Sequence, residues 1–181
     1  MRQRQSLAGL VGLATMAGAS ASAQSPTSTG PMAAEPDEGA ILTVVDAFFL
    51  AMAAKDSDAF PAIVAPGATM VALGYGDDGA LPPRRTAVQE FIDRLDDRDS
   101  ADRLEEAYWV PTVLQRADLA VVWTPYRIDL SGKRIHCGID VFNLSREAGR
   151  WLIDSISFTM EPDACPELEP AGVVARPAFE D

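Results

Sequence analysis

The chain has 181 residues, of which 27 are acidic and 15 are basic, so its formal net charge is −12 at pH 7. A strongly acidic surface repels nucleic acids and anionic lipids, and neither is therefore expected as a partner. The length suits a single domain with one hydrophobic core.

The first 23 residues have the pattern of a secretory signal peptide. Arg2 and Arg4 make a basic start, and residues 7–18 are an apolar run too short to span a bilayer. Residues 21–23 are the small-x-small motif Ala-Ser-Ala. We therefore expect cleavage after Ala23 and a mature protein that is periplasmic or secreted.

A polar leader precedes the folded domain. Residues 24–36 are rich in Ser, Thr and Pro, which is typical of a flexible segment, and the domain is expected over residues 37–162. The domain begins with a predicted helix capped by Asp37. Apolar residues at helical spacing give this helix one stripe, formed by Ile41, Val44, Val45, Phe48 and Met52.

Two further helices and a strand are predicted before the middle of the chain. Residues 56–63 favour a short helix, and residues 69–74 favour a strand. Thr86 and Gln89 match a capping box. The helix behind it has an apolar stripe formed by Val88, Phe91, Ile92 and Leu95.

The second half of the chain is rich in predicted strands. They cover residues 105–115, 119–129, 133–144 and 151–160. Short turns join them, so an antiparallel sheet is expected, and helices followed by such a sheet define an α+β fold. Residues 163–181 are acidic and proline-rich and are expected to form a loose or disordered tail.

The strand over residues 133–144 carries the best candidate for a site. Side chains alternate along a strand, so His136 and Asp140 lie on one otherwise apolar face with Phe142. An acid there must be paired, hydrogen-bonded to a group such as Ser155, or inside a cavity, where burial would raise its pKa. His136 lies about 13 Å from Asp140 along the strand, so direct contact is not expected. This spacing does not favour a metal site, which needs three or four ligands.

The two cysteines, Cys137 and Cys165, allow two alternatives. In an exported protein they can form a disulfide if the tail folds back over the sheet. Otherwise Cys137 is a buried thiol and Cys165 an exposed one.

Several segments together resemble the nuclear transport factor 2-like superfamily, which includes ketosteroid isomerases, polyketide cyclases and small proteins labelled as lumazine-binding. The matching segments are residues 48–52, 55–59, 64–69, 118–122, 136–142 and 149–151. The resemblance covers about residues 38–162. It implies a curved antiparallel sheet wrapped around the N-terminal helices into a cone, a deep apolar pocket, and frequent dimers through the sheet.

The resemblance also assigns positions to catalytic groups. Asp140 takes the place of the carboxylic acid that stabilises an oxyanion in the isomerases. Phe48 stands at the position of their tyrosine, and Ala72 at that of their general base. Steroid-type isomerisation is therefore not expected, unless a loop residue such as Tyr75, Asp77 or Asp78 supplies a base.

The expected ligand is a small apolar or aromatic molecule, and no cofactor is expected. The residues predicted to line its pocket are Phe48, Met52, Tyr75, Trp109, Trp123, Tyr126, His136, Phe142 and Phe158.

Three functions agree with these patterns. The first is an exported small-molecule-binding protein. The second is a cofactor-independent isomerase, hydratase or cyclase that uses Asp140 as an acid or oxyanion donor. The third is a structural dimerising module with a collapsed pocket. An open pocket with a second titratable group beside Asp140 would favour the enzyme, and Asp140 alone would favour binding.

Overall fold

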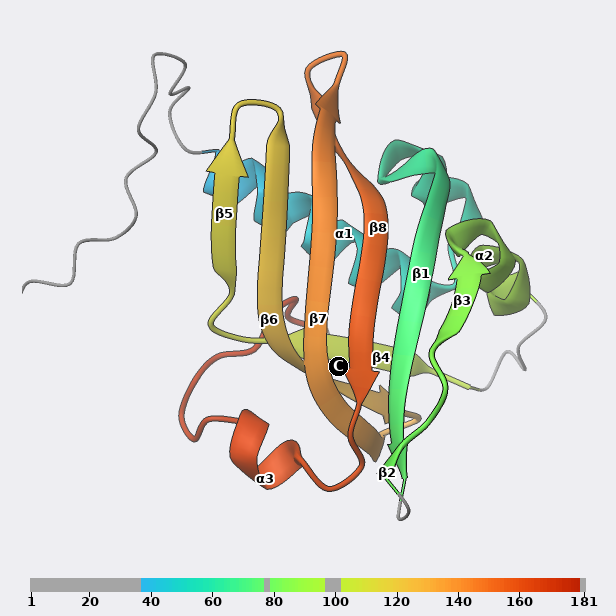
Figure 1. The fold of residues 1–181 in the computed structure, drawn as a ribbon, viewed down its shortest axis with the longest axis vertical. Helices are drawn as coiled ribbons and strands as arrows, with labels where there is room; N and C mark the ends of the chain where they lie inside the picture. The colour runs from blue at the N-terminus through green and yellow to red at the C-terminus, as the bar shows by residue number, and fades with distance from the viewer. Residues whose placement is uncertain (1–36, 77–78, 97–101, 180–181) are drawn as a thin grey trace, which may run out of the picture.

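The computed structural model describes residues 37–76, 79–96 and 102–179 (Figure 1). The predicted signal peptide, the leader over residues 24–36, and Asp77 and Asp78 lie outside the described residues. Within the described part, no helix is both long enough and apolar enough to cross a membrane.

Helix α1 (Glu38–Ala54) follows the predicted stripe and buries Ile41, Val45, Phe48 and Met52. The carbonyl of Asp37 accepts the N–H of Ile41, but its side chain does not cap the helix as predicted. Instead, the carboxylate accepts a hydrogen bond from the indole of Trp151. The short helix that was predicted next is the 3-10 helix η1 (Ser57–Ala62). The second predicted helix is α2 (Val88–Asp96).

The strands form one curved sheet that α1 crosses on one face (Figure 1). They are β1 (Val64–Gly76), β2 (Gly79–Ala80), β3 (Arg84–Ala87), β4 (Leu104–Tyr108), β5 (Thr112–Arg116), β6 (Leu119–Leu130), β7 (Lys133–Glu147) and β8 (Arg150–Met160). The order is β2-β1-β8-β7-β6-β4, with β3 paired to β1 and β5 paired to β6. All pairs are antiparallel except β1 with β8. The expected α+β architecture is confirmed.

Two predicted strands differ in extent. Strand β1 begins at Val64, before the predicted start, and its register against β8 shifts between Val64 and Thr69. The predicted strand over residues 105–115 is divided into β4 and β5, because Val110 has a φ of 47° and proline follows it. Both new strands pair with β6, β5 along its first half and β4 along its second half.

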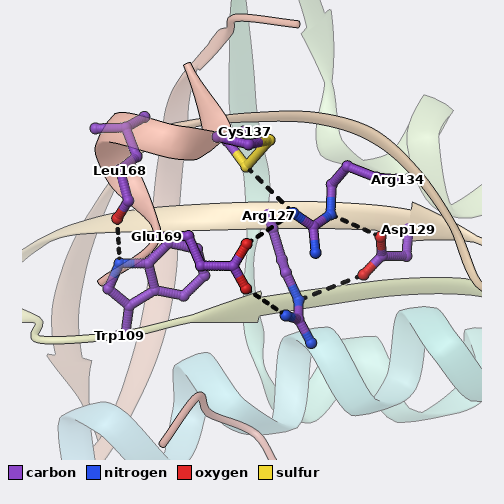
Figure 2. Close-up of polar contacts among 8 residues, drawn as sticks. Trp109, Arg127, Asp129, Arg134, Cys137, Leu168 and Glu169 are labelled. Carbon is purple, nitrogen blue, oxygen red and sulfur yellow. Dashed lines mark hydrogen bonds and ion pairs between the residues drawn. A yellow bond between two sulfur atoms is a disulfide. The ribbon is translucent and has the colours of Figure 1, made fainter. Parts of the chain in front are cut away.

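The described part of the C-terminal tail is tied to the sheet and is not a loose extension. Cys137 of β7 and Cys165 are joined by a disulfide at the start of helix α3 (Cys165–Leu168). Directly after α3, Glu169 forms ion pairs with Arg127 at 2.6 Å and Arg134 at 2.8 Å (Figure 2). The tail is therefore held against β6 and β7 by one covalent and two ionic contacts.

The tail then reaches the free edge of β4. Backbone hydrogen bonds of 2.7 Å join Tyr108 and Arg176 in both directions, so Arg176 pairs with the last residue of this edge. Its guanidinium pairs with Asp46 of α1, which also accepts the Tyr108 hydroxyl. The indole of Trp109 donates to the carbonyl of Leu168 (Figure 2). The last residue of this edge strand, Tyr108, thus has its backbone groups paired by the tail.

A close approach at Gly138 shapes the centre of the sheet. Gly138 pairs with Tyr126 across β6 and β7. A Cβ at this position would lie 2.8 Å from Cε1 of Tyr126 and would overlap the backbone oxygen of Thr159. The same oxygen accepts the Tyr126 hydroxyl at 2.6 Å. The absence of a side chain therefore allows the ring of Tyr126 to lie close to Gly138 and its hydroxyl to reach Thr159 of β8.

Replacing Gly138 with alanine is expected to lower the free energy of unfolding by at least about 2 kcal/mol, because backbone must move to admit the methyl group. Chemical denaturation followed by circular dichroism measures this. Gly39→Ala is the control, because a Cβ there meets nothing within 4 Å and α1 favours alanine. Equal stability of the two variants would show that β7 and β8 are not packed as described.

Candidate functional site

A cavity of about 340 Å³ lies between the helices and the concave face of the sheet. Most of the pocket residues predicted from the sequence line it, namely Phe48, Met52, Tyr126, His136, Phe142 and Phe158, together with Asp140. The lining is mainly apolar, and the volume lies at the lower end of the range for small-molecule pockets. The open cavity goes against the alternative of a collapsed pocket.

Three predicted pocket residues do not line this cavity. Trp123 lies on the opposite face of β6, where its side chain is 45% exposed, because inward positions of β6 are the even-numbered ones. Tyr75 lies at the end of β1 and is 44% exposed. Trp109 is buried, but against the tail, where it bonds to Leu168. Trp123 was expected in the pocket because of the family resemblance, and Tyr75 and Trp109 because they are aromatic residues near the predicted sheet; none of the three lines the cavity.

The sheet side of the cavity includes two rows of cross-strand neighbours that run from β7 through β8 and β1 to β3. The first row contains Asp140, Phe158, Ala72 and Arg84. The second contains Phe142, Ile156, Met70 and Thr86. All eight residues line the cavity. Each row thus has an apolar middle, and the first has an acid at one end and a base at the other.

Asp140 has a partner that the sequence did not reveal, Glu106 of β4. Their carboxyl groups share a hydrogen bond. Both side chains are buried, with exposures of 2% for Asp140 and 9% for Glu106. Oδ2 of Asp140 is itself buried and accepts no hydrogen bond from an N–H or hydroxyl group of the described residues. Both acidic residues line the cavity.

The curvature of the sheet brings these two acids together. On β6, Asp140 pairs opposite Thr124 and Glu106 pairs opposite Ile128. Four residues of a flat strand span about 13 Å. Contact between the two carboxyl groups therefore requires that β6 bend sharply between these positions, as Figure 1 shows for its lower half.

Burial raises the pKa of both carboxyl groups, because it disfavours their charged forms. The pKa of Asp140 is raised to about 8 by burial, against a smaller opposing effect of the hydrogen bond from Glu106. Burial raises the pKa of Glu106 well above its usual range, and the charge of Asp140 raises it further. The pair therefore holds at least one proton at pH 7.

The neighbouring polar groups stay uncharged. Burial, together with the nearby acids, raises the pKa of Tyr126, whose hydroxyl lies 3.3 Å from Nδ1 of His136. Burial lowers the pKa of His136, so its imidazole is neutral at pH 7. His136 faces the cavity beside Ile135, an extra residue in β7 where the register against β6 shifts. The histidine thus lies near Tyr126 and does not pair with Asp140.

The positions assigned by the family resemblance also line the cavity. Phe48 and Ala72 both face it, so neither a tyrosine hydroxyl nor a carboxylate is supplied from those two places. Phe48 instead packs edge to face against Phe60 and Phe142 at the helix side of the cavity. Across residues 37–76, 79–96 and 102–179, no three His, Cys, Asp or Glu side chains are placed to hold a metal ion.

Sequence reasoning missed Glu106, Arg84 and Arg94, which all line the cavity. Strand periodicity held a usable signal for Glu106, because it lies between the inward residues Leu104 and Tyr108. No such signal existed for the arginines, because β3 was not predicted and the open face of α2 resembled a solvated surface.

Known proteins resemble this chain in structure but not in sequence. No family model and no curated protein matches it. An NTF2-like protein from Cytophaga hutchinsonii has a TM-score of 0.56 at 12% identity, over 69% of this chain and 98% of its own. A conserved protein from Planctomyces limnophilus has a TM-score of 0.54 at 20% identity, over 70% and 97%.

A third solved structure extends the comparison. A protein of unknown function with a cystatin-like fold from Nostoc punctiforme has a TM-score of 0.54 at 12% identity, covering 70% of this chain and 92% of its own. At such low identities the likeness concerns the fold. The curved sheet, the helix across its concave face and these neighbours agree: the chain has the nuclear transport factor 2-like fold.

Proposed function

We propose that this protein binds a small, largely apolar molecule in the cavity and donates a hydrogen bond to it from Asp140. The observation that carries the proposal is the buried carboxyl group of Asp140, whose pKa burial raises to about 8, on a mainly apolar wall of the cavity. A protonated carboxyl group can donate a hydrogen bond to a ligand oxygen, and such a bond is stronger away from water. A ketone or similar carbonyl compound with an aromatic or aliphatic body fits both features.

A second candidate function is acid–base catalysis without a cofactor. It is favoured by Glu106, because a second titratable group in contact with Asp140 allows one carboxyl to donate while the other accepts. One carboxyl would hydrogen-bond the ligand carbonyl, and the other, as carboxylate, would remove a proton from the neighbouring carbon. The resulting enol would take a proton back, so isomerisation or proton exchange would follow.

The ketone 2-acetonaphthone in D₂O tests both proposals at once. We expect it to bind, and its methyl protons next to the carbonyl to exchange for deuterium faster than without protein, as ¹H NMR measures. Asp140→Asn keeps a hydrogen-bond donor but cannot act as a general acid or base. It should lower the exchange rate about 100-fold or more, while calorimetry shows a much smaller change in affinity. The rate should rise with pH toward about 8, as Asp140 ionises.

Glu105→Gln is the matched control for Glu106→Gln. Glu105 is the neighbouring residue of β4 and pairs with Arg103 outside the cavity. Only the Glu106 substitution should slow exchange. Exchange that persists in Asp140→Asn would exclude the catalytic role and leave binding, and absence of ketone binding would contradict the binding proposal.

We further propose that the protein is exported. The proposal rests on the leader pattern of residues 1–23 and agrees with the disulfide between Cys137 and Cys165, since such bonds persist in oxidising compartments.

We also propose a homodimer through the outer face of the sheet. Three exposed apolar side chains gather on the outer faces of β5 and β6, namely Leu114, Leu119 and Trp123. Exposed apolar patches on soluble proteins commonly mark interfaces.

Light scattering after size exclusion tests the dimer. We expect a dimer for the native chain and a monomer for Trp123→Arg, because a charge would be buried in the interface. Tyr75→Arg is the control, since Tyr75 is equally exposed but lies at the end of β1. A native monomer, or an unchanged dimer in Trp123→Arg, would contradict this interface.

A further inference from the structure

Two arginines line the cavity that holds the carboxyl pair. Arg84 comes from β3 and Arg94 from α2, and both side chains are exposed to solvent on one side. They are unusual in a chain with a net charge of −12 and in a lining that is otherwise mainly apolar. Their elements meet at the edge of the sheet, far in the strand order from β4.

The register fixes where Arg84 lies relative to Asp140. Asp140 pairs with Phe158, Phe158 with Ala72, and Ala72 with Arg84. Three strand spacings separate the two backbones, or about 14 Å along the sheet. The acid and the arginine therefore lie at opposite ends of one row, with the apolar side chains of Phe158 and Ala72 between them.

Within the described ranges of the chain, the two arginines have no other partner. Neither guanidinium has an ion pair or hydrogen bond with any residue that the structure describes. Two acids of α2 have other partners, because Glu90 accepts a hydrogen bond from the hydroxyl of Thr86 and Asp93 accepts one from the amide of Gln89. A cation at a pocket mouth without a protein partner is available to an anionic ligand group.

We infer that the ligand is an amphipathic anion, an apolar body that carries a carboxylate, sulfonate or phosphate group held by Arg84 and Arg94 while its other end meets Asp140. This inference rests on the proposed binding function and adds the charge and orientation of the ligand. Neutral apolar molecules of the same shape fit the middle of the row but leave both arginines unused.

Two fluorescent probes that differ only by one anionic group test the inference. They are 1-anilinonaphthalene-8-sulfonate and its neutral analogue N-phenyl-1-naphthylamine. We expect the native protein to bind the sulfonate more tightly than the neutral probe. The double substitution Arg84→Gln with Arg94→Gln should weaken sulfonate binding at least about tenfold and leave the neutral probe nearly unchanged.

Arg85→Gln is the matched control. Arg85 neighbours Arg84 on β3 but does not line the cavity, and its loss removes one positive charge, as the loss of either cavity arginine does. It should alter neither probe. If the neutral probe binds as tightly as the sulfonate, the anion site is excluded but binding in the cavity is supported. The same conclusion follows if Arg85→Gln weakens sulfonate binding as much as the double variant does. If neither probe binds, both the anion site and the proposed binding function fail.

Discussion

The main physical constraint on the cavity is the free-energy cost of removing the carboxyl groups of Asp140 and Glu106 from water at one end of it. Asp140 and Glu106 offset part of that cost by sharing a hydrogen bond and keeping a proton. The buried carboxyl groups destabilise the fold at high pH. Because the pKa of Asp140 is raised in the folded state, the stability that its bound proton contributes is fully present below the ordinary pKa of 3.8 and is lost as the pH rises to about 8. A group retained at such a cost favours a functional role.

The shape of the sheet makes this contact possible. Glu106 and Asp140 meet only because β6 bends between Thr124 and Ile128, and the bend lies where Tyr126 packs over Gly138 and reaches Thr159. Behind the bend, the tail is fastened to the same strands by the disulfide and by Glu169 (Figure 2). Close packing of Tyr126 against Gly138 therefore sets the shape of the sheet at the cavity, and contacts with the C-terminal tail hold the same strands in place.

Period-two alternation was enough to predict that His136, Asp140 and Phe142 share a face, and helical spacing predicted the buried side of α1. Both patterns arise within a single strand or helix, so the face that each side chain takes can be predicted from the spacing of residues in the sequence. Trp109 and Trp123 were misplaced because the backbone turns at Val110 and because alternation alone does not say which face is inward. Glu106 was missed because its pairing with Asp140 arises from curvature between distant strands, which no local pattern contains.

A ¹³C NMR titration of the side-chain carboxyl carbons measures whether the carboxyl pair keeps a proton at neutral pH. We expect one carboxyl that titrates near pH 8 in the native protein and is absent from the titration of Asp140→Asn. If the carbons of Asp140 and Glu106 both titrate near pH 4, with the ordinary aspartates and glutamates, the pair is charged and solvated at neutral pH and holds no proton there.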